Sequence, residues 1–337
     1  MKVIGIKKSL PIDHSDSFVS AELDKPSPSG HDLLVKVRAV SVNPVDYKVR
    51  QNSAKDRTLD SPKVLGWDAV GVVEEIGDQV SLFAIGDAVY YAGDIQRPGS
   101  NAEYQLVDER IAGNKPKALS DEEAAAMPLT SLTAWEAIFE RLAIEKNGGR
   151  GKSVLMIGGA GGVGSIAIQL AKQLTQLTVV ATASRDETTQ WCLDRGADAV
   201  ANHHDLLASV REAGYEHVDY ILNFADTDQH WEATSELIKP QGRICSIVEN
   251  QVPLNMKKIR SKSVSFSWEL MFTRAMYHTD DMIQQHHILN SVSSLLDQGV
   301  LQSTLTTTLE GLAVKNFKKA HALQESGTAI GKTVISF

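Results

Sequence analysis

One short stretch of this chain has the residue types and the spacing to bind a pyrophosphate. It reads G-x-G-x-x-G, with glycines at positions 159, 161 and 164. The first glycine permits a tight turn, the second lets the backbone approach the phosphates, and the third lets a helix lie close to a strand. The free N–H groups at the start of that helix favour an anion. We therefore expect six loop residues to bind a dinucleotide: Gly159, Ala160, Gly161, Gly162, Val163 and Gly164.

The elements around this loop are those that the mechanism requires. An apolar run at 154–157 predicts a strand before the glycines, and a helical pattern at 163–174 follows them. Beyond it, strand and helix patterns alternate, which predicts a parallel sheet covered by helices on both faces. The strands are expected at 177–184, 199–200, 218–225 and 242–248, and the helices at 186–195 and 229–238.

The remainder of the chain has a different pattern. Alternating or glycine-closed runs at 33–44, 69–77 and 87–93 predict a β-rich unit. Ser120 and Glu123 form a capping-box pattern at the first helix start. Near the C-terminus we expect a helix at 279–297, a strand-like run at 301–310, a helix at 315–325 and a strand at 331–337. The predicted fold is α/β: a doubly wound Rossmann domain (126–269) inserted into a β-rich domain (1–125 and 270–337).

The composition excludes several classes of protein. The 337 residues carry a net charge of −8, which argues against a broad nucleic-acid or anionic-membrane surface. No apolar run of about 18 residues predicts a membrane span, and no secretory signal is visible. The two cysteines, Cys192 and Cys245, lie in apolar stretches of sequence, and we expect them to be small core residues. We expect a cytoplasmic protein.

The second predicted strand of the Rossmann domain indicates which nicotinamide dinucleotide is bound. An acidic residue about 20 positions after the glycines binds the ribose 2′-hydroxyl of NAD. Here the strand ends at Ser184-Arg185, and a guanidinium forms charge-assisted hydrogen bonds with a 2′-phosphate. Arg185 and Ser184 therefore predict NADPH. Asp186, the next residue, reads as an acid at a helix N-terminus.

Two later strands end in residues that should also line the cofactor. In such sheets the ligand crevice lies at the carboxyl ends of the strands. The residues expected there are Asn223, Phe224, Ser246 and Ile247.

Several motifs together resemble the medium-chain dehydrogenase/reductase superfamily. They are SVNPVDYKVR (41–50), VLGWDAVGVVEEIGDQV (64–80), IGDAVY (85–90), MPLTSLTAWEAI (127–138), the glycine loop and GKTVI (331–335). More narrowly, the chain resembles the zinc-independent NADPH:quinone oxidoreductase branch, in the subgroup named "zinc-type alcohol dehydrogenase-like". The resemblance implies that the β-rich domain is a GroES-like catalytic domain completed by the C-terminus.

The same resemblance implies roles for individual residues. It places Asn43 and Asp46 beside the nicotinamide. Either Lys48 or Tyr47 would donate a hydrogen bond to the acceptor's oxygen, and either Tyr47 or solvent would give the proton. A surface helix lysine is an equal interpretation of Lys48. Thr130 and Thr133 would approach the nicotinamide ribose or carboxamide, or cap a helix, and His203 stands where related reductases approach the adenosine phosphate.

The sequence predicts no metal. Zinc-dependent relatives carry G-H-E where this chain has Gly66-Trp67-Asp68, and their early cysteine corresponds to the region of Asn43. A catalytic zinc needs three ligands of Cys, His or carboxylate type. The adjacent pairs His203–His204 and His286–His287 are expected to point apart and to be solvated.

The predicted activity is NADPH-dependent hydride transfer to quinones or α,β-unsaturated carbonyls. The alternatives are a non-catalytic NADPH-binding protein and a zinc alcohol dehydrogenase. An apolar substrate wall is suggested, with ordinary core packing as the alternative for each member: Trp67, Tyr91, Trp268 and Phe272. Residues 264–268 could form a strand that pairs two copies as a homodimer.

Overall fold

The computed structural model describes residues 1–337, and the chain divides into two compact units. Unit 1 comprises Met1–Leu132 and Phe272–Phe337, and unit 2 comprises Thr133–Met271. The first division falls inside helix α3 (Pro128–Trp135) rather than at 125/126. This is because α2 (Asp121–Ala125), which precedes α3, packs on the sheet of unit 1.

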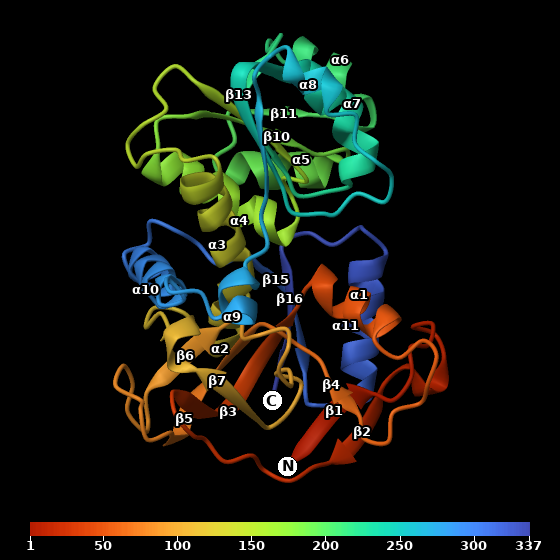
Figure 1. Ribbon diagram of the computed structural model, residues 1–337, viewed down its shortest axis with the longest axis vertical. Coiled ribbons are helices and arrows are strands. Elements are labelled where there is room, and N and C mark those ends of the chain that lie inside the picture. The colour runs from red at the N-terminus through yellow and green to blue at the C-terminus, as the bar shows by residue number, and fades with distance from the viewer. The chain divides into compact units, whose positions relative to one another are not determined.

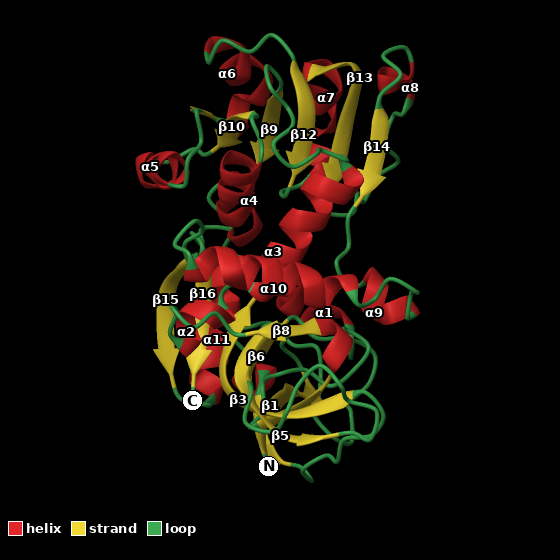
Figure 2. Cartoon of the chain, turned by 90° about the vertical axis from the view of Figure 1, so that its left-hand side faces the viewer, coloured by secondary structure: helices red, strands yellow, loops and turns green.

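Unit 2 is built on a six-stranded parallel sheet (Figure 2). Its central strand β9 is buried along its whole length, as expected of a strand covered on both faces. The spatial order of the strands is β11 (Ala199–Ala201), β10 (Thr178–Thr182), β9 (Ser153–Ile157), β12 (Val218–Asn223), β13 (Ile238–Ser246) and β14 (Ser265–Trp268). The order reverses between β9 and β12, and the carboxyl ends of these two strands are therefore the topological switch point.

Helices follow the strands of unit 2 in the predicted alternation. They are α4 (Gly162–Leu174), α5 (Asp186–Asp194), α6 (Leu206–Glu212), α7 (Thr227–Leu237) and α8 (Lys257–Arg260), with a short helical turn η4 (His203–Asp205) and a π-helical turn η3 (Glu136–Arg141) that continues α3. Side chains of α6 and α7 pack with β9 and β12 in one apolar core, which includes Val210, Trp231 and Leu155. The predicted Rossmann fold is confirmed.

Unit 1 contains a seven-stranded sheet that joins the two ends of the chain. Its order is β15 (Leu305–Glu310), β16 (Lys332–Ser336), β3 (Asp32–Val42), β5 (Ala69–Ile76), β6 (Ala88–Tyr91) and β8 (Ala112–Asn114), with β7 (Tyr104–Asp108) also paired to β3. The C-terminal strand β16 runs antiparallel to β3, with Thr333 opposite Val42 (Figure 1). A smaller sheet has the order β2 (Val19–Glu22), β1 (Lys2–Ile6), β4 (Lys63–Val64).

The helices of unit 1 lie mainly in its C-terminal part. They are α1 (Pro44–Asn52), α2, α9 (Thr273–Tyr277), α10 (Gln284–Asp297) and α11 (Val314–Glu325), with helical turns η1 (Ser15–Ser17) and η2 (Glu109–Ile111). The predicted capping box is present at α2, because Glu123 N–H donates to Ser120 and Ser120 N–H donates to Glu123. Neither unit contains a helix long and apolar enough to cross a membrane.

Candidate active site

The glycine loop of unit 2 joins β9 to α4, and the start of the helix lies in close contact with the loop backbone. Gly158, just before the predicted motif, has a φ of +87° and donates its N–H to Thr182 Oγ1 at 3.0 Å. Gly159 N–H donates to the Thr182 carbonyl at 3.1 Å. A Cβ on Gly164 would lie 2.3 Å from the Gly158 carbonyl oxygen, so the third glycine lets the helix approach the loop as predicted. Gly161 and Gly162 remain partly exposed at the start of α4, where N–H groups can face an anion.

The residues predicted to end β12 and β13 lie at the same edge of this sheet. Phe224 N–H donates to the Ile157 carbonyl at 3.0 Å, and Ile247 N–H donates to the Asn223 carbonyl at 3.1 Å. Asn223 and Ser246 are buried, and the Ser246 hydroxyl lies 2.6 Å from that of Thr227. The backbone bonds therefore place all four predicted residues at the switch point beside the loop that follows Ile157.

The predicted 2′-phosphate residues follow β10 and are accessible. Ser184 and Arg185 are exposed, and α5 begins at Asp186, which is the predicted helix N-terminal acid. Arg185 N–H donates to Thr188 Oγ1 at 3.1 Å, so the backbone that carries the guanidinium is held by the first turn of α5. An exposed guanidinium in this position fits a 2′-phosphate.

The histidines near β11 differ from the sequence expectation. His203 and His204 do not point apart, because their short helical turn brings the ring centroids to 4.6 Å. His203 also lies 6.5 Å from the buried His230, measured between centroids. Burial lowers the pKa of both His203 and His230. His286 also differs, since it contacts His287 and hydrogen-bonds the Ala112 carbonyl within the fold.

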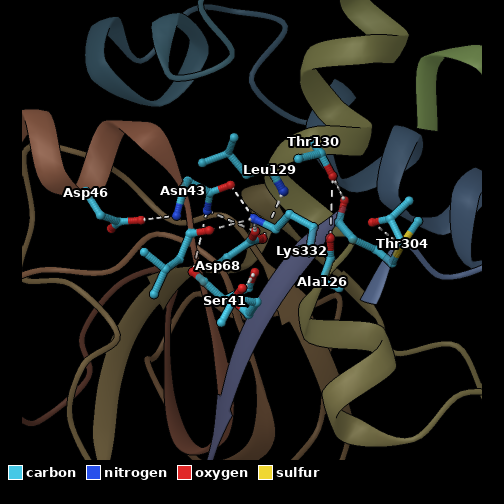
Figure 3. A network of polar contacts seen from close by, with 12 residues as sticks. Ser41, Asn43, Asp46, Asp68, Ala126, Leu129, Thr130, Thr304 and Lys332 are labelled. Carbon is cyan, nitrogen blue, oxygen red and sulfur yellow. Dashed lines mark hydrogen bonds and ion pairs between the residues drawn. The ribbon is translucent and has the colours of Figure 1, made fainter. Parts of the chain in front are cut away.

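Unit 1 contains a buried polar network that the sequence did not reveal (Figure 3). Lys332, on β16, donates from Nζ to the Val42 carbonyl at 3.2 Å, to Asp68 Oδ2 at 3.1 Å and to Asn43 Oδ1. Asn43 Nδ2 donates to the same carboxylate at 3.1 Å. Lys332, Asp68 and Asn43 expose at most 2% of their surface. Three acceptors around Nζ require three donated hydrogens, and Lys332 is therefore an ammonium.

Asp68 links this network to helix α3. Its Oδ1 accepts a hydrogen bond from Leu129 N–H at 2.9 Å. Burial raises the pKa of Asp68, and the Lys332 ammonium, Leu129 N–H and the Asn43 amide oppose that rise. The carboxylate thus has three donors, one of which is its counter-ion, and this arrangement permits a buried charge.

Asp46 is the second buried carboxyl of the site. It is 1% exposed, and its Oδ2 accepts from Asn43 N–H at 2.5 Å at the start of α1. Its Oδ1 is buried and has no hydrogen-bond partner. Burial raises the pKa of Asp46 to about 7, while the nearby Lys332 cation opposes the rise and Asp68 adds to it. Asp46 is therefore more readily protonated than an exposed aspartate.

The other predicted residues of this unit differ in exposure. Tyr47 and Lys48 are half-buried on α1, and burial raises the pKa of Tyr47. Thr130 is buried, and its hydroxyl donates to the Met127 carbonyl at 3.2 Å instead of capping the helix. Thr133 is also buried, in the part of α3 that belongs to unit 2.

The four aromatic residues of the predicted substrate wall differ in burial. Trp67, Tyr91 and Phe272 are at most 2% exposed in unit 1, where Trp67 packs edge to face on Phe272 and donates Nε1–H to the Asp94 carbonyl. Trp268 is 45% exposed on β14 of unit 2. Three of the four are core residues, the alternative that the sequence left open.

The residues at the Gly66–Asp68 motif do not fit a zinc site. The position of the family's histidine is occupied by the buried Trp67, and the carboxylate of Asp68 is paired with the Lys332 ammonium. No three His, Cys, Asp or Glu side chains are grouped so that they could hold a metal ion. A zinc ion would need three such ligands.

Asp46→Asn is expected to reduce the pH dependence of stability. The wild-type carboxyl has a folded pKa of about 7, whereas an unfolded Asp titrates at about 3.9. Between these values the folded state keeps a proton that the unfolded state loses, so wild-type stability falls as pH rises through the window, by on the order of 4 kcal/mol. The substituted amide cannot titrate, but its oxygen can still accept the Asn43 N–H.

Denaturant unfolding at pH 4.5 and pH 8 measures this difference, with the exposed Asp56→Asn as the matched control. Parallel pH profiles of wild type and Asp46→Asn would show that the buried carboxyl has an ordinary pKa.

The chain combines a Rossmann unit that carries a dinucleotide loop with a β-rich unit that the C-terminal strand completes. This combination defines a medium-chain dehydrogenase or reductase. Two family descriptions match: "Alcohol dehydrogenase GroES-like domain" over residues 29–117 and "Zinc-binding dehydrogenase" over residues 195–335. A zinc-type alcohol dehydrogenase-like protein of Staphylococcus epidermidis is 46% identical, covering 100% of this chain and 99% of its own. The chain belongs to the zinc-type alcohol dehydrogenase-like proteins of this superfamily, and it is an NAD(P)-dependent oxidoreductase.

Other relatives extend the comparison. A structure from Rhizobium etli CFN 42, provisionally described as a zinc-dependent alcohol dehydrogenase, is 50% identical with a TM-score of 0.95, covering 100% of this chain and 98% of that one. A quinone oxidoreductase structure from Coxiella burnetii is 26% identical with a TM-score of 0.82, covering 100% and 99%. A 2-methylene-furan-3-one reductase of Solanum lycopersicum is 41% identical over 180 residues, which are 51% of this chain and 44% of its own.

Proposed function

We propose that this protein is an NADPH-dependent reductase of quinones or α,β-unsaturated carbonyls that acts without zinc. The observation that carries the proposal is the buried Lys332–Asp68–Asn43 network, in which the carboxylate of Asp68 is already paired with the Lys332 cation. Reduction of a simple aldehyde or ketone usually relies on a metal ion that polarises the carbonyl, and such a Lewis acid is missing without zinc. Conjugated acceptors need less help, because the developing charge spreads from carbon to oxygen.

The printed names of two relatives support the same substrate class. The Solanum lycopersicum protein is called a reductase of a 2-methylene-furan-3-one, in which a methylene group is conjugated with a ring ketone. The Coxiella burnetii structure is called a quinone oxidoreductase, and a quinone is also a conjugated dicarbonyl. Both names describe acceptors in which reduction places negative charge on an oxygen.

The chain's own residues would bind the cofactor in unit 2 and stabilise the acceptor's charge in unit 1. In unit 2 the glycine loop would hold the pyrophosphate, and Ser184 with Arg185 would hold the 2′-phosphate. The bound nicotinamide supplies a hydride. In unit 1 the half-buried Tyr47 or Lys48 would donate to the acceptor's oxygen as charge develops there. The proton that completes the reduction would come from Tyr47 or from solvent.

Two assays, together with zinc analysis of the purified protein, test the proposal: NADPH oxidation with a panel of quinones, enones and aldehydes, and NADP⁺ reduction with a panel of alcohols. Turnover with quinones or enones by metal-free protein is expected. Tight NADPH binding without turnover of any acceptor would favour a non-catalytic binding protein. Bound zinc with alcohol turnover would identify an alcohol dehydrogenase.

Arg185→Ala should change cofactor preference. Loss of a charge-assisted contact of about 1.5–3 kcal/mol corresponds to roughly a 10- to 100-fold increase in the KM for NADPH. The KM for NADH should stay within about twofold, because NADH has no 2′-phosphate to bind the guanidinium. Steady-state kinetics with both cofactors measures the ratio, with the exposed Arg150→Ala as control. An equal change for NADPH and NADH would contradict the assignment of Arg185.

We also propose that two copies associate through β14. This strand is the edge of the unit 2 sheet, and it carries the exposed Trp268. Such an edge leaves backbone groups available for a second strand. Light scattering should give the mass of a dimer, and a monomer mass at micromolar concentration would contradict the proposal.

A further inference from the structure

We propose that Lys332 is a positioning residue, whose buried ammonium fixes the side chains of Asn43 and Asp68 and so holds the starts of α1 and α3 in one arrangement. The inference rests on the proposed function, since α1 carries Tyr47 and Lys48. Lys332 itself has no hydrogen left for a substrate, because Val42, Asn43 and Asp68 accept all three.

The network determines the orientation of the Asn43 amide. Oδ1 accepts from the Lys332 ammonium, and Nδ2 donates to the Asp68 carboxylate at 3.1 Å. An amide turned by 180° would place its N–H groups against the ammonium and its oxygen against the carboxylate. Both contacts would be repulsive in a site from which water is excluded. A cation on one side and an anion on the other thus select a single orientation.

Asn43 and Asp68 extend this constraint to two helix starts. Asn43 is the residue before α1, and its N–H donates to Asp46 in the first turn. Asp68 accepts from Leu129 N–H in the first turn of α3, next to Thr130. One ammonium on the C-terminal strand therefore joins the segment that carries Tyr47 and Lys48 to the segment that carries Thr130 (Figure 3).

Charge balance distinguishes positioning from plain stabilisation. Lys332→Met leaves the Asp68 carboxylate buried without its cation, which strongly destabilises a fold, whereas a neutral pair is tolerated. The double variant Lys332→Met/Asp68→Asn removes both charges but also removes the selection of the Asn43 orientation. If Lys332 only stabilises the fold, the charge-balanced double variant should behave like wild type. If Lys332 positions Asn43, the double variant should still be impaired, because the charges that select the amide orientation are gone.

The experiment compares wild type, Lys332→Met and the double variant, with Lys36→Met, an exposed lysine on β3, as control. Lys332→Met is expected to lower the midpoint of thermal unfolding by about 5 °C or more, and the double variant should recover most of this loss. The kcat of both variants should nevertheless fall about tenfold or more, because small misplacements are amplified in rate. Their KM for NADPH should change by less than about threefold.

A second measurement does not depend on turnover. The side-chain amide of Asn43, observed by ¹⁵N NMR, should exchange its hydrogens with solvent at least about tenfold faster in both variants than in wild type. Recovery of kcat together with stability in the double variant, or unchanged Asn43 exchange, would overturn the positioning role. Wild-type protein that reduces no acceptor would remove the proposed function, and the Asn43 exchange would still decide the role of Lys332.

Discussion

Gly164→Ala is expected to lower the free energy of unfolding by about 1–3 kcal/mol and to weaken NADPH binding about tenfold or more. The added Cβ would lie 2.3 Å from the Gly158 carbonyl oxygen and 2.6 Å from that of Gly159. Both atoms belong to the backbone, which cannot rotate away as a side chain can. Helix α4 must therefore move away from the loop, and the N–H groups proposed to bind the pyrophosphate would move with it.

Gly161→Ala separates the two effects. Gly161 has a φ of −71°, which alanine readily adopts, and its Cβ would meet only the Gly158 carbonyl oxygen, at 3.5 Å. This variant should keep its stability but bind NADPH more weakly, because the new methyl group faces the phosphates. Chemical denaturation and fluorescence titration with NADPH measure the two quantities. Wild-type stability in Gly164→Ala would show that α4 does not depend on this close approach.

The Rossmann unit was predictable because its signals are local. The glycine loop, the apolar run at 154–157 and the helix that follows lie within about twenty residues, and each is recognised by its own periodicity. The placement of Asn223 and Ser246 beside the glycine loop follows from topology alone, since carboxyl ends of parallel strands meet at one edge. Only Gly158 and Thr182, which shape the loop through backbone and hydroxyl bonds, needed the structure.

The network in unit 1 was not predictable from local pattern. Lys332 lies 264 positions from Asp68 and 289 from Asn43, and no periodicity connects them. The available signal was a lysine at the start of an otherwise uncharged C-terminal strand, Lys332–Ser336, where a charged residue needs a partner to be buried. The sequence could not decide the role of the aromatic residues either, because Trp67 and Phe272 are the same residue types whether they line a pocket or a core.

A second charged cluster, in unit 2, also depends on contacts between distant residues. Glu136 lies in the π-helical turn after α3, and Glu269 follows the edge strand β14, with side chains only 1% and 0% exposed. Arg141 donates from Nε to Glu269 at 2.7 Å and places NH2 3.8 Å from Glu136. Burial raises the pKa of Glu269, and the Arg141 guanidinium opposes that rise.

Arg141→Met is therefore expected to destabilise unit 2 by about 3–5 kcal/mol at neutral pH, because it removes the cation from two buried carboxyls. The loss should shrink as pH falls. Burial already raises the pKa of Glu269 in the wild type, and loss of the Arg141 cation should raise it further. As the pH falls, the variant should therefore take up its proton before the wild type does and regain stability relative to it. Arg141→Met/Glu269→Gln, which removes one carboxylate, should recover part of the loss at neutral pH.

Urea unfolding between pH 5 and pH 8 measures this dependence, and Glu140→Gln, which changes a partly exposed carboxylate near the same arginine, is the control. A loss in Arg141→Met that stays constant across this range, or a double variant no more stable than the single one, would show that the guanidinium acts through packing of its apolar stem. In that case the link between the π-helical turn and β14 does not depend on charge.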